Sequence, residues 1–342
     1  MGVKSYVLTR AANRLATLVA LMIFSFFIFE IIPQALGIQL PFLFAGVSPQ
    51  QVKNSLPQVV QATIKAYDLN GPIWARLGHF LLNMFTLNYG NSAYFKKPVI
   101  AVIGQYLPNT LVLGVAALAT TSAISLVAGV VAGRSFIKSK RKTTDKAVSL
   151  TSIGLFFLPA IWISIILYVY FADQLHLFPI NLADALNCLG TCHPTGLAFF
   201  ARYLWAAFLP IVVVTVVGFG HRQQLIRNNL IEEYTSSSYS IYARARGLPD
   251  RTIFYKHALR NAMLPWLTQT GIDVAFLISG IFFVEYIFNF TGLGYASTIA
   301  AQNLDMPFLI STTFIFGAYI LIVLFILDLL YARVDPRIRL GE

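Results

Sequence analysis

The stretch Tyr239-Ser-Ile-Tyr-Ala-Arg-Ala-Arg-Gly247-Leu-Pro249 decides how the rest of the chain is organised, because it is a long polar segment between strongly apolar ones. Tyr239, Ala243 and Gly247 are spaced by four residues, so they share one face of a helix. Gly247 can adopt the left-handed conformation that ends a helix, and Pro249 can open a second helix that runs to Pro265. The result is a short helix, a sharp stop and a second helix, presented to the cytoplasm with small residues on its face. This shape suits a groove on a partner protein better than it suits catalysis.

The composition of the chain is that of a membrane protein. Hydrophobic residues make up 57% of its 342 residues and charged residues only 11%, so a soluble globule could not cover its own surface. The net charge of +11 does not indicate nucleic-acid binding, because the basic residues flank apolar segments instead of forming one face. Nineteen of the 25 Lys and Arg residues fall on one predicted side of the membrane. The positive-inside rule then places both termini in the cytoplasm of a multi-pass protein in the cell membrane.

Six apolar segments are long enough to cross a bilayer of about 30 Å. They lie at about 15–33, 107–132, 148–171, 201–220, 266–288 and 308–331. We interpret the first as an uncleaved span, and Pro159 in the third as a packing kink. The chain is therefore predicted to be an all-α polytopic protein with three parts: a cytoplasmic N-terminus and first span (1–33), an extracytoplasmic region (34–104), and a five-helix core (105–342) that contains the cytoplasmic loop 221–265.

Motifs for bond chemistry do not occur in the sequence. There is no G-x4-G-K-[ST] loop to cradle ATP, no H-E-x-x-H and no G-x-S-x-G. The five histidines are scattered over both predicted faces of the membrane. The sequence therefore does not indicate an enzyme.

The cytoplasmic stretch resembles the EAA loop of ABC-importer permeases, specifically those of the dipeptide and oligopeptide branch. Twelve residues fall on the pattern of that loop: Tyr239, Ala243, Arg244, Ala245, Gly247, Leu248, His257, Ala258, Leu259, Arg260, Asn261 and Pro265. Arg246 replaces the usual lysine, and Ser238 stands where the family has an acid before the tyrosine. The resemblance extends over nearly the whole chain, with Leu107-Pro108-Asn109-Thr110 and the tail Asp335-Pro336-Arg337-Ile338-Arg339 also matching, although Pro-Gly-Asp-Pro after the first span is missing.

This resemblance implies a type I ABC-importer permease fold. The residues expected to couple the chain to an ATPase are Tyr239, Ala243, Arg244, Ala245, Arg246, Gly247 and Leu248. The implied partners are a homologous second permease, two cytoplasmic ABC ATPases and an external solute-binding protein. The implied complex binds ATP and Mg²⁺ on the ATPase subunits, and this chain carries no cofactor. The substrate class is di- and oligopeptides, with oligosaccharides or nickel as alternatives.

Polar residues inside the fifth span are the candidates for a translocation path, because such groups are costly in lipid. They are Gln269, Asp273, Ser279 and Glu285. The alternative is structural: Asp273 pairs with a nearby base and Glu285 caps an external loop. Cys188 and Cys192, in an outside loop, can form a disulfide or remain free thiols.

Two other classes of protein compete with the importer. A membrane receptor or scaffold would fit the topology but not the helix–Gly–helix loop. A secondary carrier coupled to protons or sodium would favour inverted repeats, and the sequence contains no internal repeat.

Overall fold

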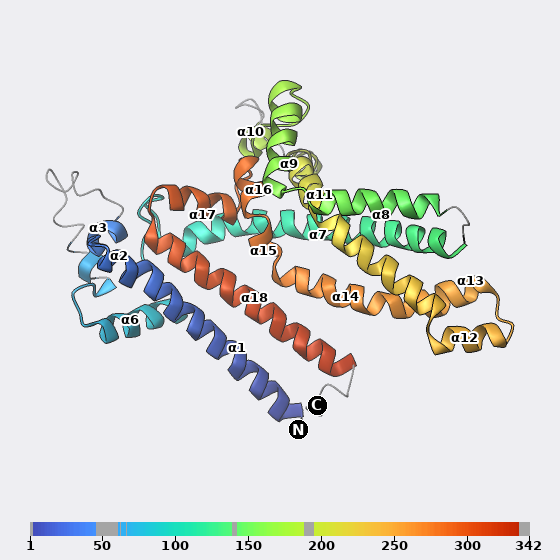
Figure 1. Cartoon of the computed structure of the whole chain (residues 1–342). Helices are drawn as coiled ribbons and strands as arrows, with labels where there is room; N and C mark the ends of the chain where they lie inside the picture. Colours follow the sequence, from blue (N-terminus) through green and yellow to red (C-terminus); the bar gives the residue numbers. More distant parts are fainter. Residues whose placement is uncertain are drawn as a thin grey trace. The chain divides into compact units, whose positions relative to one another are not determined.

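The computed structural model describes residues 3–45, 61, 63–65, 67–138, 142–187 and 195–334 (Figure 1). Across these ranges the regular elements are helices, and strand pairing is limited to one bridge between Asn91 and Pro98. The expected all-α fold is confirmed.

Six candidate membrane spans lie within the described residues if each bent helix pair counts as one span. Four single helices are long and apolar enough to cross a bilayer: Ser5–Ala35, Val99–Lys138, Gly196–Thr235 and Met306–Leu330. The two bent pairs are Thr143–Phe156 with Ala160–Gln174, at 95°, and Asp250–Ala275 with Leu277–Ile287, at 61°. This count agrees with the six spans expected. At 1.5 Å per residue the two 40-residue helices are about 60 Å long, so they project well beyond the hydrocarbon layer.

The chain divides into two compact units, the first made of residues 1–110 and 292–342, the second of residues 111–291. The described helices of the first unit, with η for a π-helix, are α1 (Val3–Phe26), η1 (Phe27–Ile31), α2 (Ile32–Ala35), α3 (Leu40–Ala45), α6 (Ile73–Phe85), the start of α7 (Val99–Lys138), α17 (Leu293–Gln302) and α18 (Met306–Val334). Those of the second unit are the rest of α7, α8 (Thr143–Phe156), α9 (Ala160–Leu167), η2 (Tyr168–Gln174), α10 (Leu182–Asn187), α11 (Gly196–Thr235), α12 (Ser238–Ala245), α13 (Asp250–Thr252), η4 (Ile253–Ala258), α14 (Leu259–Ala275), α15 (Leu277–Gly280) and α16 (Phe282–Ile287).

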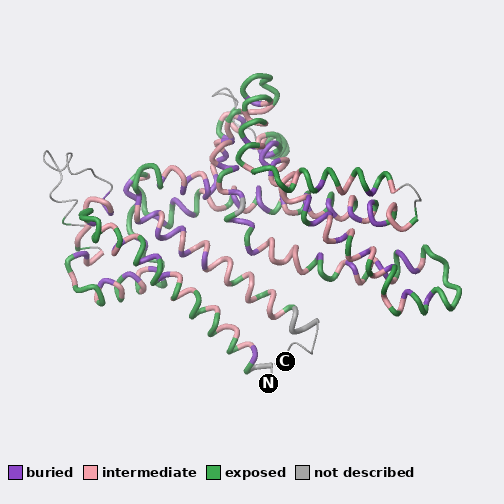
Figure 2. The backbone as a smooth tube through the Cα atoms, in the orientation of Figure 1, coloured by how far each residue is buried: buried purple, intermediate pink, exposed green. Residues whose placement is uncertain are grey.

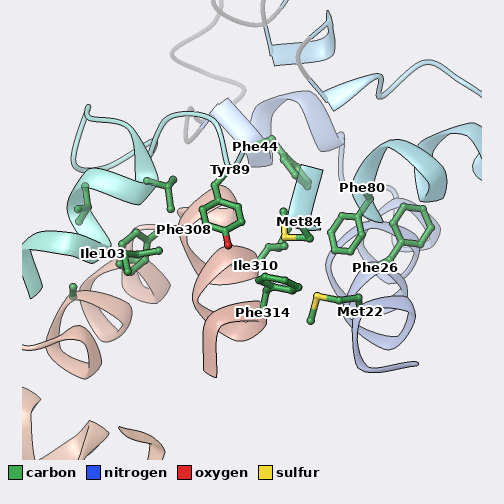
Figure 3. Close-up of a cluster of buried hydrophobic side chains, with 14 of the residues drawn as sticks. Met22, Phe26, Phe44, Phe80, Met84, Tyr89, Ile103, Phe308, Ile310 and Phe314 are labelled. Carbon is green, nitrogen blue, oxygen red and sulfur yellow. The ribbon is translucent and has the colours of Figure 1, made fainter. Parts of the chain in front are cut away.

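The first unit is built on α1 and α18, which lie side by side (Figure 1). Gly317 permits their close approach, since a Cβ there would lie 2.4 Å from Leu21 Cδ2. Aromatic rings fill the core beside this pair (Figure 3). Phe26 of α1 meets Phe80 of α6 edge to face, with ring centroids 5.5 Å apart, so the external helix α6 is packed onto the first span.

A buried ion pair also joins the first span to α6. Arg76 donates to Glu30 Oε2 from Nη2 at 2.6 Å and from Nε at 3.2 Å, and its Nη1 reaches Gln34 Oε1 at 2.9 Å. Glu30 and Arg76 are each only 3% exposed. Glu30 is therefore paired, at the end of the first span. Removing either charge would leave the other buried and uncompensated, which typically costs about 3–5 kcal/mol.

Asp305 fastens the loop between α6 and α7 to the start of α18. Its fully buried carboxylate accepts hydrogen bonds from Ser92 Oγ and from the backbone N–H groups of Ala93 and Tyr94, the latter two at 3.1 Å. The loop therefore has a defined conformation that depends on one side chain from a distant part of the sequence.

The second unit is organised around α11, which packs along α8 and α14. Glycines make these contacts close. A Cβ at Gly220 of α11 would lie 2.3 Å from the Ser152 carbonyl oxygen of α8, and one at Gly129 of α7 would lie 2.8 Å from the Gln223 carbonyl oxygen of α11. Small residues at helix crossings are the usual means of association inside membranes, where apolar burial between helices adds little.

The third span breaks at Pro159, where a kink was expected. α8 ends at Phe156, Pro159 is extended with ψ 130°, and α9 continues at 95° to α8. Proline disfavours helical geometry in the residue before it and supplies no N–H to the preceding turn, which accounts for a full break.

One predicted boundary is wrong. The helix that follows Pro249 does not stop at Pro265, because α13, η4 and α14 follow one another without a break to Ala275 and Pro265 lies inside α14. Proline is tolerated within a membrane helix when neighbouring groups satisfy the backbone it disturbs.

Candidate functional site

The predicted stop in the cytoplasmic stretch is present at Gly247. This residue has φ +76°, its N–H donates to the Arg244 carbonyl at 2.9 Å, and the Leu248 N–H donates to the Ala243 carbonyl at 3.1 Å. These two bonds form a Schellman C-cap on α12. The chain then turns at Pro249, which is extended, into α13.

The exposed face of α12 differs from the face that the sequence suggested. Ala243 is buried and Tyr239 is half-buried, so the side of α12 that carries these two residues points inward. Ala243 belongs to a core with Tyr234 and Phe254, and a small residue lets α12 lie close to them. Ile241 and Tyr242 are exposed instead. Figure 2 shows that most of α12 and of the turn after it is exposed. The expected face was wrong at Ala243, because this small residue provides the close packing of α12, whereas Ala245 and Gly247 are exposed.

Glu233, near the C-terminal end of α11, joins α11 to α12. Its Oε2 accepts hydrogen bonds from Ser237 Oγ at 2.6 Å and from the Tyr239 hydroxyl, and its carbonyl accepts from Ser240 Oγ at 2.8 Å. Burial, and then the hydrogen bond to Glu233, raise the pKa of Tyr239 above its ordinary value. The phenol is therefore a protonated donor at neutral pH. The sequence comparison looked for an acid directly before Tyr239 and missed this one six residues upstream.

Tyr234 ties α11 to both halves of the helix–turn–helix. Arg244 of α12 donates to the Tyr234 carbonyl and places its guanidinium 4.5 Å from the centre of the Tyr234 ring. The Tyr234 hydroxyl donates to Asp250 Oδ1 at 2.9 Å, and its ring meets the edge of the Phe254 ring at 5.9 Å. The end of α11, α12 and α13 are thus linked by side chains as well as by the chain itself.

The remaining coupling residues of the sequence prediction lie on the surface. Ala245, Arg246 and Leu248 are all exposed. Together with Ile241 and Tyr242 they form an outer face of mixed apolar and basic character. Such a face can dock to a protein, and it contains no group arranged for acid–base or nucleophilic chemistry.

Two of the four predicted path residues come together inside the second unit. Asp273 of α14 accepts from Arg222 of α11, with Nε and Nη2 each 2.6 Å from Oδ2, and Gln269 Nε2 donates to Asp273 Oδ1 at 3.0 Å. Arg222 is therefore the base with which Asp273 pairs in the structural alternative to a path residue. The Asp273 side chain retains 24% exposure, so this chain alone does not close off the pair.

The other two predicted path residues lie apart from that cluster. Ser279 is exposed and its hydroxyl donates to the Phe276 carbonyl, beside the break between α14 and α15. Glu285 is fully buried in α16, and its carbonyl accepts the Phe290 N–H at 2.8 Å. Cys188 and Cys192 lie outside the described residues.

Comparisons with known proteins fit this arrangement. Residues 125–340 match the model of the family described as "binding-protein-dependent transport system inner membrane component". The chain is 30% identical to the dipeptide transport system permease protein of Lactococcus lactis, over 98% of this chain and 99% of that protein. It is also 30% identical to the oligopeptide transport system permease protein of Bacillus subtilis (90% and 96%) and 28% identical to the metal-staphylopine import system permease protein of Staphylococcus aureus (85% and 86%).

The family description refers to an inner-membrane component and to a binding protein, and the candidate spans agree with a multi-pass protein. The family and the similar proteins are transport permeases and not catalytic enzymes. The chain belongs to the family of binding-protein-dependent transport system inner membrane components, the permease subunits of ABC importers.

Proposed function

We propose that this chain is one of two channel-forming subunits of an ATP-driven importer of di- and oligopeptides. A homologous second permease completes the pore, and two cytoplasmic ATPases bind ATP and Mg²⁺. An external binding protein delivers the substrate. Both chain termini and α12 lie on the cytoplasmic side, in keeping with the excess of Lys and Arg there.

The observation that carries this proposal is the attachment of α12 to α11. The outer face of α12 docks in a groove of the ATPase, with Ile241 and Tyr242 as its apolar contacts. Glu233 and Tyr234 fix α12 to the end of α11, and α11 continues into the membrane. When the ATPases close on ATP, α12 moves with them and α11 follows, which shifts the population between inward-open and outward-open states.

The peptide substrate is inferred from the names of the relatives and from the chemistry of the cluster around Asp273. Gln269, Asp273 and the exposed Ser279 line the path, whereas the fully buried Glu285 takes the structural role in α16. A peptide carries an amine and a carboxylate at its ends, and the partly exposed Arg222–Asp273 pair offers a complementary charge to each. A metal chelate, as in the name of the staphylococcal relative, an oligosaccharide and nickel are the alternative cargoes.

The docking role is tested with variants of the exposed face. Tyr242→Ala and Ile241→Ala leave the folded core intact, because both side chains are exposed, and are expected to weaken co-purification of the ATPases about tenfold. Gly247→Pro and Ala243→Leu should leave the protein in the membrane but separate ATP hydrolysis from uptake in proteoliposomes. Leu8→Ala, an exposed leucine of α1, is the control. Normal uptake by all four variants would contradict the docking role.

The substrate class is tested by uptake with purified binding protein. Labelled di- and tripeptides are expected to be taken up, whereas a metal chelate, an oligosaccharide and free nickel should not compete. Asp273→Asn and Gln269→Ala should lower peptide uptake while the complex still assembles. Unchanged uptake in both variants would remove these residues from the path without affecting the docking role.

A further inference from the structure

A basic hollow lies in the second unit, just after residues 239–248, which are the proposed coupling segment. Its volume is about 360 Å³, and it is lined by Arg251, Thr252, Tyr255 and Lys256 of α13 and η4. All of this lining faces away from the core, because the buried residues of the same turn are Ile253 and Phe254. The hollow therefore belongs neither to the core nor to the exposed face of α12.

Arg134 of α7 indicates where the hollow lies relative to the membrane. No charged residue occurs between Lys97 and Arg134, so Arg134 marks the point where the apolar run of α7 reaches the cytoplasm. Arg134 Nη1 donates to the Tyr255 hydroxyl at 3.0 Å, and the guanidinium lies 5.8 Å from the centre of the Tyr255 ring. The hollow is thereby held at the level of the membrane interface, where tyrosine and basic side chains are commonly found.

The positive charge around the hollow is not compensated. None of the ion pairs formed between described residues involves Arg134, Arg251 or Lys256. The nearby carboxylate of Asp250 accepts the Tyr234 hydroxyl. Thr252 and Tyr255 add hydroxyl groups to the lining, so the hollow offers two ammonium- or guanidinium-type charges and two neutral donors to a single ligand.

An apolar strip leads from the hollow along α7. Val127 and Val131 are exposed, and with Arg134 they are spaced by four and three residues, which places all three on one face of the helix. A ligand with a phosphate at one end and hydrocarbon at the other would meet matching chemistry along its whole length. A free anion would use only the basic end.

We infer that this hollow is a binding site for the phosphate of an anionic membrane lipid, with Arg251 and Lys256 as its charged ligands and the acyl chains lying along Val127 and Val131. Basic pockets at the cytoplasmic ends of membrane helices bind such headgroups, at about 1 kcal/mol per Lys or Arg. The bound lipid contacts the segment that directly follows α12 in the chain, so lipid composition affects the coupling segment from its membrane side.

The test is a titration of the purified full-length protein, in detergent and in its complex, with phosphatidylglycerol and with phosphatidylcholine, followed by native mass spectrometry. Phosphatidylglycerol is expected to bind preferentially. Arg251→Gln and Lys256→Gln should each weaken that binding about fivefold. Lys146→Gln removes an equally exposed cytoplasmic charge from α8 and is the matched control. Thermal unfolding of each variant checks that the fold is retained.

Three results would overturn the inference. The first is equal retention of the two lipids, or a loss of phosphatidylglycerol binding in Lys146→Gln as large as that in Arg251→Gln and Lys256→Gln. The second is displacement of the lipid by millimolar inorganic phosphate, which would indicate a site for free phosphate. The third is unchanged lipid binding in Arg251→Gln or Lys256→Gln together with loss of the ATPase subunits from the complex, which would make the hollow a protein contact. None of these results depends on whether the permease transports peptides.

Discussion

At the scale of single residues, the coupling segment depends on groups whose side chains point away from the docking surface. Glu233 accepts two hydroxyl hydrogen bonds from the start of α12, and neither hydroxyl belongs to the exposed face. Hydrogen bonds to a charged acceptor contribute about 1.5–3 kcal/mol each in folded proteins. The position of α12 is therefore sensitive to a residue outside the proposed docking face.

Glu233→Ala is expected to loosen α12 and to lower the amount of substrate transported per ATP hydrolysed severalfold, while ATPase binding changes little. Glu233→Gln keeps one acceptor oxygen and should recover part of that loss. Glu232→Ala, which removes the neighbouring exposed acid, is the control. The measurement is the amount of substrate transported per ATP hydrolysed in proteoliposomes. Equal values for Glu232→Ala and Glu233→Ala would contradict the role given to Glu233.

Tyr239 sets the expected pH dependence of this contact. Its pKa is raised by burial and by the hydrogen bond to Glu233, so the neutral phenol is favoured in the folded state. Its stabilising contribution is fully present below the unfolded-state pKa of about 10 and is lost only as pH rises through the higher folded value. The ratio of coupling in Tyr239→Phe to that in the wild type should therefore stay constant between about pH 6 and pH 9. A ratio that changes within this range would show that Tyr239 ionises there.

At the scale of helices, the second unit depends on how closely α8 and α11 approach. Gly220→Ala would place a Cβ 2.3 Å from the Ser152 carbonyl oxygen and 2.8 Å from Phe156 Cβ, and the former is backbone that cannot move aside alone. Overpacking of this kind costs about 1–3 kcal/mol, so a clearly lower Tm is expected. Gly154→Ala, in α8 itself, meets nothing within 4 Å and should be neutral or slightly stabilising. Equal Tm values for the two variants would disprove the close contact.

At the scale of the whole molecule, each unit has its own core and its own polar ties. Asp305→Asn places an amide where four donors converge in the first unit, so the loop that contains Ser92 should lose its anchor. Hydrogen exchange of residues 91–98 is expected to rise at least tenfold, with no change in α12 of the second unit. A matching rise in α12 would show that the two units do not respond separately.

The sequence predicted features that depend on local geometry, and it missed those that depend on distant neighbours. Gly247 as a helix stop and Pro159 as the site of a kink both follow from the backbone freedom of one residue, although the kink is a full break. The inward orientation of Ala243 could not be read from its spacing, because spacing identifies a face without saying which side is buried. The pairing of Arg222 with Asp273, 51 residues apart, required the packing of α11 on α14.

The buried pair of Glu30 and Arg76 has an evolutionary consequence. Each charge is tolerated at 3% exposure only because the other is present. A lineage that loses one of them passes through a protein with an isolated buried charge, which is less stable than either the ancestral pair or an apolar pair of similar volume. The two positions should therefore be inherited together or replaced together, and descendants that carry only one of the charges should be rare.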